Sequence, residues 1–312
     1  RPLVVINVVG LTHEMLGPNT PNLSKLAADG FSRPMGTVLP AVTCSAQSTI
    51  LTGTLPREHG IVANGWYFRD VSEVALWKQS NRLVRGERVY DAARKRDNNY
   101  TVAKMFWWYN MYADVDWSVT PRPCYPADGR KLFDSYSQPV GLKDELQSRF
   151  GVFPLFRFWG PTADITSSRW IADASIEVMR QQNPSLTLVY LPHLDYNLQR
   201  LGPSDPAIAD DIRAIDAEAG KLIDAAKARD ADVIVLSEYA ITDVDRPVHI
   251  NRILREHGFV DTRMEIGGWE TLDFGSSRAF AVADHQLAHV YIQRPEDVPR
   301  VAEILQRVDG VE

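Results

Sequence analysis

The chain has 312 residues, of which 45% are hydrophobic and 24% are charged, ordinary values for a globular protein. A formal net charge of −6 argues against a nucleic-acid polymer as partner, because the chain has no overall basic field. No apolar run in the sequence approaches the ~20 residues that are needed to span a membrane.

Cysteine content and the N-terminus bear on the compartment. The two cysteines, Cys44 and Cys124, are too few for a disulfide framework and are typical of a reducing environment. The apolar stretch at the N-terminus is too short and too strand-like for a secretory signal. We therefore expect a cytoplasmic protein. Because the chain begins without Met, the alternative of a leader that has been removed stays open.

The opening residues predict a strand followed by a helix. Residues 3–9 form a continuous, largely β-branched apolar run that ends at Gly10, typical of a strand buried on both faces of a parallel sheet. Residues 21–29 predict a helix, with Thr20 as its N-cap and Gly30 as its stop. The chain thus opens in the manner of an α/β protein.

Residues 40–64 predict a turn, a short helix that begins near Thr43, a Thr-Gly-Thr exit and a loop that ends at Asn64. A hydroxyl at a helix N-terminus lies at the positive end of the backbone dipole, where a phosphate or another anion binds well. The alternative is that Thr43 or Ser45 only caps the helix.

An aromatic-rich segment follows. Residues 66–117 hold 12 of the chain's 30 aromatic residues, and a proline-rich stretch continues to residue 131. We interpret residues 66–160 as a cap inserted over the mouth of the main sheet, which gives a substrate pocket an apolar wall. The alternative, that these aromatic side chains only fill a core, stays open.

The rest of the chain alternates strands with helices. The strands are expected at 186–191, 233–236, 279–283 and 290–292, and the helices at 167–182, 206–228, 247–257 and 295–307. This alternation predicts right-handed βαβ units and a mainly parallel central sheet with helices on both faces. We expect one α/β domain over residues 1–312, with the cap as its insertion.

Polar residues follow several of the predicted strands, where ligands bind in open parallel sheets. His193 and Asp195 follow the strand at 186–191, and Glu238 and Tyr239 follow the next strand. His285 follows the strand at 279–283, and Thr43 belongs at the same edge. The sequence therefore predicts a site at the carboxyl ends of the strands.

The segment 40–64 resembles the nucleophile segment of the type I phosphodiesterases/nucleotide pyrophosphatases, a branch of the alkaline phosphatase superfamily. The opening strand and the helix that carries T-P-N-L-S-K-L also resemble this family. The resemblance implies an alkaline-phosphatase-like fold, a Thr43 that attacks phosphorus and an Asn64 that holds a phosphoryl oxygen. The matching positions are Thr43, Thr52, Gly53, Pro56, His59, Gly60, Ile61 and Asn64.

Enzymes of this superfamily hold two metal ions, and the resemblance shows where this chain departs from their ligand pattern. The first ligand position falls on Val9, which cannot bind a metal, and a histidine position falls on Gln199. The paired Asp-His is Glu238-Tyr239, and the late His is His285. We expect a modified metal site of Asp195, Glu238 and His285. Further candidate site residues are Asn7, His193, Gln199, Tyr239 and His289.

The expected cofactor is a divalent Zn²⁺ or Mn²⁺ ion, with one ion favoured over two and a metal-free site as the alternative. In a metal-free site Tyr239 would donate a hydrogen bond to an oxyanion. Each candidate also has a structural alternative, as a hydrogen-bonded histidine or as a carboxylate that caps a helix.

The predicted function is hydrolysis of a small phosphorylated or anionic substrate by a phosphodiesterase-type or nucleotide-pyrophosphatase-type enzyme. The first alternative is a non-catalytic relative that binds such a ligand, because several metal ligands are replaced. The second is a phosphotransferase, because a phosphoenzyme can pass its phosphoryl group to an alcohol.

Overall fold

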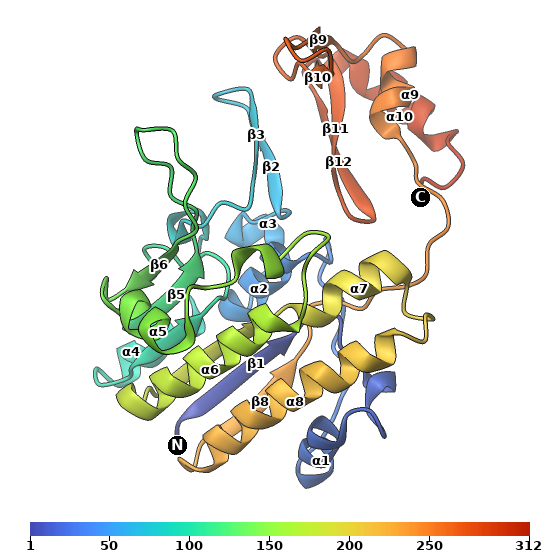
Figure 1. Cartoon of the computed structure of the whole chain (residues 1–312). Helices are drawn as coiled ribbons and strands as arrows, with labels where there is room; N and C mark the ends of the chain where they lie inside the picture. Colours follow the sequence, from blue (N-terminus) through green and yellow to red (C-terminus); the bar gives the residue numbers. More distant parts are fainter. The chain divides into compact units, whose positions relative to one another are not determined.

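The computed structural model describes all 312 residues, and they form two compact units (Figure 1). Unit 1 comprises Arg1–Ile61 and Gln79–Asp243, and unit 2 comprises Val62–Lys78 and Val244–Glu312. No helix of the chain combines the length and the apolar character that crossing a bilayer requires.

Unit 1 is built on a six-stranded sheet with the order β6-β5-β4-β7-β1-β8. All neighbouring strands run parallel except β6, which pairs with β5 in the antiparallel sense. The predicted α/β fold with a mainly parallel central sheet is therefore confirmed. The strands are β1 (Leu3–Val8), β4 (Val102–Met105), β5 (Trp117–Pro121), β6 (Ser135–Gln138), β7 (Leu186–Leu191) and β8 (Asp232–Leu236).

Helices cover both faces of this sheet because its central strands are apolar on both faces. Val5 of β1 packs in one hydrophobic cluster with Leu51 of α2 (Thr43–Thr52) and Tyr90 of α4 (Val89–Arg96). Successive residues of a strand point to opposite faces, so Val4 and Ile6 face away from that cluster. On that other face lie α6 (Ile165–Gln182) and α8 (Ile208–Lys227), which run side by side in Figure 1.

The start of helix α6 differs from the prediction, and the remaining helices of unit 1 are shorter. Helix α6 begins earlier than predicted because the Asp164 side chain accepts a hydrogen bond from the backbone N–H of Thr166 at 2.9 Å, a standard N-cap. The others are α1 (Pro21–Asp29), α3 (Pro56–His59), α5 (Leu142–Phe150) and α7 (His193–Leu201), with 3₁₀ turns at His13–Met15, Asn81–Leu83 and Leu155–Arg157.

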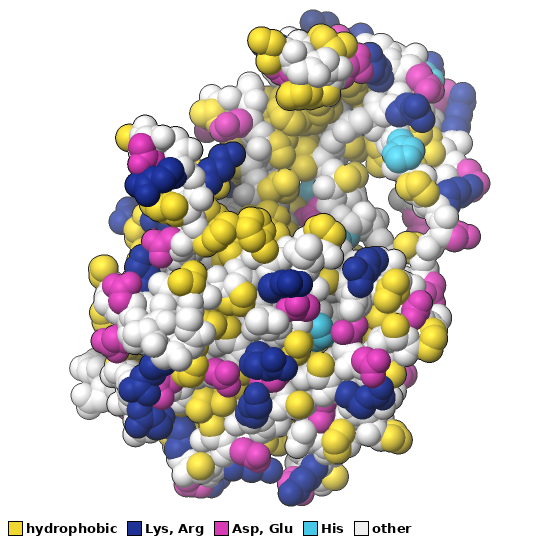
Figure 2. Space-filling model, viewed as in Figure 1, with side chains coloured by type: hydrophobic (Ala, Val, Ile, Leu, Met, Phe, Trp, Pro, Cys, Tyr) yellow, Lys and Arg dark blue, Asp and Glu magenta, His cyan; other side chains and the backbone are white.

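The surface of unit 1 carries both signs of charge. Figure 2 shows Lys and Arg side chains interspersed with Asp and Glu side chains over the face that α6 and α8 form. Glu218 of α8, for example, accepts from Arg169 at 3.2 Å and from Lys221 at 2.7 Å. This mixture agrees with the absence of a basic field in the composition.

The aromatic-rich segment contributes strands to the central sheet. Strands β4, β5 and β6 all lie within residues 66–160, the range predicted as a cap, so this range includes half of the sheet. Trp107 is fully buried, and Phe106 and Tyr109 are buried with it, as the packing alternative requires. The boundaries of a cap stay a prediction.

Unit 2 consists of three antiparallel hairpins and two helices. Tyr67 packs in its core with Leu254 of α9, Phe280 of β11 and Val301 of α10. The elements are β2 (Gly65–Phe68) with β3 (Glu73–Leu76), β9 (Thr262–Met264) with β10 (Glu270–Leu272), β11 (Ala279–Asp284) with β12 (Leu287–Ile292), α9 (Ile250–Glu256), a 3₁₀ turn at Pro295–Asp297 and α10 (Val298–Gln306).

The placement of the strand at 279–283 in the parallel sheet was wrong. β11 pairs only with β12, in register from Ala279–Ile292 to Asp284–Leu287, so that His285 lies in the hairpin turn. Two residues connect these strands, which suits an antiparallel hairpin and is far too short for a parallel crossover. His285 therefore does not follow a strand of the central sheet.

Candidate active site

Thr43 is the first residue of α2 and is buried, with 3% of its surface exposed. The N-cap is Val42, in extended conformation, and no side chain caps the helix. The alternative that Thr43 or Ser45 serves as the cap is therefore wrong, and the Thr43 hydroxyl is available for other contacts. Its Oγ1 lies 3.5 Å from the phenolic oxygen of Tyr239, which follows β8.

Asp195 lies in the first turn of α7, just beyond the end of β7. The phenol of Tyr239 donates to its Oδ1 at 3.0 Å. The side-chain amide of Gln199, one helical turn later, donates to its Oδ2 at 2.7 Å. Both oxygens of this buried carboxylate thus accept hydrogen bonds from neutral groups.

Glu238 follows β8 and is buried beside the neighbouring strand β1. Its Oε1 accepts from the amide of Asn7 and from the amide of Gln47, each at 2.5 Å. Burial raises the pKa of the Glu238 carboxyl to about 7, while hydrogen bonds from Gln47, Thr43 and Asn7 oppose the shift. At neutral pH this carboxyl is therefore divided between its two protonation states.

Gln47 is a site residue that the sequence analysis missed. It lies one turn after Thr43 on α2, and its Oε1 accepts from the backbone N–H of Trp108 at 2.7 Å. That bond orients the amide so that its Nε2 faces Glu238. The only sequence signal is the spacing of four residues from Thr43, which places both side chains on one face of a helix.

His193 pairs with a different helix. Its Nε2 lies 3.0 Å from Oδ1 of Asp211 on α8. Burial lowers the pKa of His193, and the neighbouring Asp211 opposes that shift. This pairing is the structural alternative for His193, because it ties the start of α7 to α8.

Three candidate residues belong to unit 2. The backbone N–H of Asn64 donates to Asp284 Oδ2 at 2.7 Å, and its side-chain amide donates to Asp284 Oδ1 at 3.1 Å. The Nε2 of His289 lies 2.9 Å from the carbonyl oxygen of Val62, a structural contact. The side chain of His285 is 41% exposed, with Nε2 at 3.6 Å from Asp284. A shared site of these residues with Thr43 stays a prediction.

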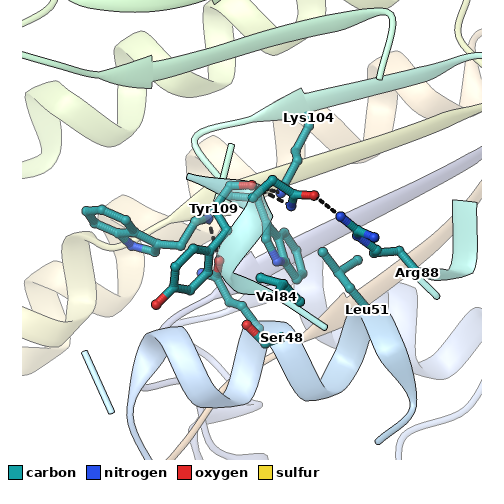
Figure 3. Close-up of a pocket in the computed structure, with 10 residues that line it drawn as sticks. Ser48, Leu51, Val84, Arg88, Lys104 and Tyr109 are labelled. Carbon is teal, nitrogen blue, oxygen red and sulfur yellow. Dashed lines mark hydrogen bonds between the residues drawn. The ribbon is translucent and has the colours of Figure 1, made fainter. Parts of the chain in front are cut away.

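A second buried cluster lies further along α2. Lys104 of β4 is fully buried, and its ammonium donates to the carbonyl oxygen of Tyr109 at 2.8 Å. Lys104 lines a small cavity of about 10 Å³. Figure 3 shows Arg88, Leu51 and Ser48 among the other residues that line it. Burial lowers the pKa of Lys104 to about 7, and the neighbouring Arg88 adds to the shift.

An open cleft adjoins α7. It has a volume of about 360 Å³, within the range of small-molecule sites. Gln199, which binds Asp195, is among its lining residues. The others are Gly160, Pro161, Ala163, Tyr196, Asn197 and Arg200.

The residues present do not fit the metal centre that the resemblance implies. Nowhere in the structure do three His, Cys, Asp or Glu side chains lie together so that they could hold a metal ion. The positions around Asp195 and Glu238 supply amide N–H and phenolic O–H groups, whose protons repel a cation. The expected set of Asp195, Glu238 and His285 therefore stays a prediction that this geometry does not support.

A mainly parallel sheet with a threonine at a helix start, beside carboxylates that follow the strands, defines an α/β protein of the alkaline-phosphatase-like class. The family model described as type I phosphodiesterase/nucleotide pyrophosphatase matches residues 3–310. The chain belongs to this family.

Individual relatives are distant. An uncharacterised pyrophosphatase/phosphodiesterase of Schizosaccharomyces pombe is 25% identical over 264 residues, which are 81% of this chain; the chain spans about half (46%) of that relative's length. Murine ectonucleotide pyrophosphatase/phosphodiesterase 5 matches with a TM-score of 0.62 at 15% identity, covering 98% of this chain and 69% of the murine chain.

A phosphonoacetate hydrolase from Sinorhizobium meliloti 1021, in complex with phosphonoacetate, matches with a TM-score of 0.66 at 14% identity. The match covers 99% of this chain and 73% of the hydrolase. At these identities the two structural matches show the fold alone.

Proposed function

We propose that this chain hydrolyses phosphoric esters with Thr43 as its nucleophile. The observation that carries the proposal is the position of Thr43, at the start of α2 and 3.5 Å from Tyr239, which itself binds Asp195. The positive end of α2 favours a phosphoryl group in front of this hydroxyl. Asn64, in unit 2, is proposed to hold a phosphoryl oxygen.

The reaction has two steps. The Thr43 oxygen forms a bond to phosphorus, the ester bond breaks, and the leaving alkoxide takes its electron pair. The hydroxyl proton passes to the Glu238 carboxylate, which lies beside Thr43. The leaving alkoxide takes the proton from Glu238. Water then attacks phosphorus, the bond between phosphorus and the Thr43 oxygen breaks, and the phosphoryl group leaves with the water oxygen, while a proton from the water passes through Glu238 to the Thr43 oxygen and restores the hydroxyl.

The cleft along α7 is the proposed entrance for the substrate. It is of small-molecule size, and Gln199 connects it to Asp195. Arg200, which also lines the cleft, offers a positive charge to an anionic substrate. We therefore propose a small phosphorylated or anionic substrate.

Solved structures of relatives support this choice. One contains murine ectonucleotide pyrophosphatase/phosphodiesterase 5 as an inactive threonine-to-alanine variant in complex with AMP. Another contains the Sinorhizobium hydrolase with phosphonoformate. Both ligands are small and carry a phosphate or phosphonate group, so AMP and aryl phosphodiesters are suitable first probes. A cytoplasmic location stays a prediction.

The test is hydrolysis of an aryl phosphodiester by Thr43→Ala, compared with wild type and with Thr43→Ser. Loss of the nucleophile lowers kcat by about 10³-fold or more. Thr43→Ser keeps an alcohol at this position and retains turnover. Thr52→Ala, at the other end of α2, is the matched control and keeps wild-type rates. A Thr43→Ala enzyme that is folded and fully active would refute the assignment.

The hydrogen bonds on Asp195 and Glu238 favour a second function, binding of a phosphorylated ligand without turnover. If no substrate in a panel of phosphate and phosphonate esters is cleaved, calorimetry with AMP distinguishes a binding protein from an inactive preparation. The phosphotransferase alternative is tested by product analysis with an added alcohol acceptor.

A further inference from the structure

We propose that neutral hydrogen-bond donors have replaced divalent cations in this centre, so that Asn7, Gln47, Gln199 and Tyr239 hold the two carboxylates that metal ions hold elsewhere in the superfamily. The inference deepens the proposed function, because it concerns the same centre. Three features carry it, namely the donors on Asp195, the donors on Glu238 and the shortage of other ligands.

Asp195 is held from both sides. The Gln199 amide lies 2.7 Å from Oδ2, and the Tyr239 phenol lies 3.0 Å from Oδ1. Each of these groups presents a proton to the carboxylate. Gln199 and Tyr239 thus stand where further metal ligands would have to lie, and a phenol or an amide nitrogen is a poor metal ligand.

Glu238 is held by two amides at one oxygen. The Gln47 amide cannot turn its carbonyl oxygen toward Glu238 without losing the bond to the Trp108 N–H at 2.7 Å. The nitrogen of Gln47 therefore stays on the carboxylate. Asn7 contributes a second N–H to the same oxygen.

The acceptors that remain are too few for a metal ion. Oε2 of Glu238 and Oδ1 of Asn7 are buried and have no hydrogen-bond partner. Zn²⁺ takes about four ligands and Mg²⁺ about six. The centre has two carboxylates, Asp195 and Glu238, and no third His, Cys, Asp or Glu side chain lies with them to complete a metal site.

The decisive experiment measures metal uptake, with no substrate present. Wild type, Asp195→Asn and the double variant Gln199→His/Tyr239→His are dialysed against Zn²⁺, freed of excess ion and analysed for metal content. Two imidazoles beside Asp195 provide three ligands and leave a fourth position for water, so we expect the double variant to bind about one zinc ion per chain. Wild type takes up no more zinc than Asp195→Asn.

Two results would overturn the inference. One is stoichiometric zinc or manganese in wild type that Asp195→Asn loses. The other is a folded double variant that binds no zinc, because Gln199 and Tyr239 would then not be the residues that close the site. Thr43→Ala keeps the wild-type metal content under the proposal, so a failed hydrolysis test and a failed metal test are distinguishable.

Discussion

Two buried sites along helix α2 hold groups of opposite charge, and they stabilise those charges differently. At the first site Glu238 accepts hydrogen bonds from the amides of Asn7 and Gln47. At the second site Lys104 donates to the carbonyl oxygen of Tyr109. Burial raises the pKa of the acid to about 7 and lowers the pKa of the lysine to about 7.

Neutral dipoles thus moderate the cost of burying a charge and do not abolish it. Glu238 has several donors directed at it, yet its carboxyl still favours the neutral form more than an exposed glutamate does. Gln47 links the two sites, because its amide nitrogen donates to Glu238 while its carbonyl oxygen accepts from the backbone of Trp108, which also lines the Lys104 cavity.

Breaking that link is expected to have the largest effect on stability. Gln47→Leu keeps the side-chain volume and removes both hydrogen bonds of Gln47. The buried N–H of Trp108 then loses the Gln47 oxygen as acceptor, and the buried Glu238 carboxylate loses one of its donors. The expected loss is about 2–4 kcal/mol in the free energy of unfolding, measured by urea denaturation.

The matched control for this change is Gln181→Leu. Gln181 donates to Glu177 on the surface of α6, and its replacement is expected to change stability by less than about 0.5 kcal/mol. Equal losses for the two variants would mean that the buried amide has no special role.

The buried Lys104 makes the stability of the chain depend on pH. The pKa of Lys104 is about 7 in the folded chain and 10.5 as its ordinary value, with Arg88 lowering it and Asp91 raising it. Between these pH values the unfolded chain binds the proton and the folded chain does not. Stability therefore rises with pH from about 7 to about 10, by up to about 1.4 kcal/mol per pH unit.

Lys104→Met removes this dependence, so thermal unfolding followed from pH 7 to pH 9 gives a smaller slope for the variant than for wild type. Lys25→Met, an exposed position on α1, is the control and keeps the wild-type slope. A wild-type stability that falls over this range, with no difference from Lys104→Met, would contradict the assignment.

The sequence predicts most of the sheet because the central strands are buried on both faces. Continuous apolar runs at 3–8 and 186–191 have no other stable place in an α/β fold. The strand β4 escapes such a prediction, since it has four residues and one of them is Lys104. Burial of that lysine depends on partners far away in the chain, which local pattern does not contain.

The candidate site, like the sheet, could be predicted from the sequence only in part. The carboxyl ends of parallel strands meet at one edge, so Asp195, Glu238 and Tyr239 were expected to lie near Thr43, and the structure brings these four together. Gln47 was missed because a neutral amide within a helix carries no charge pattern. His285 was misplaced because a two-residue connection decides between a hairpin and a crossover.

The smallest expected effect comes from an exposed ion pair. Arg213 of α8 pairs with Asp210 and also donates to Asn19 at 2.7 Å, with about half of its side chain in solvent. Water already solvates both charges, so Arg213→Ala is expected to cost less than about 0.5 kcal/mol and to lose that effect in high salt. Urea denaturation at low and high salt measures it. A loss as large as that of Gln47→Leu would show that exposed charge pairs, rather than buried neutral donors, dominate the stability of unit 1.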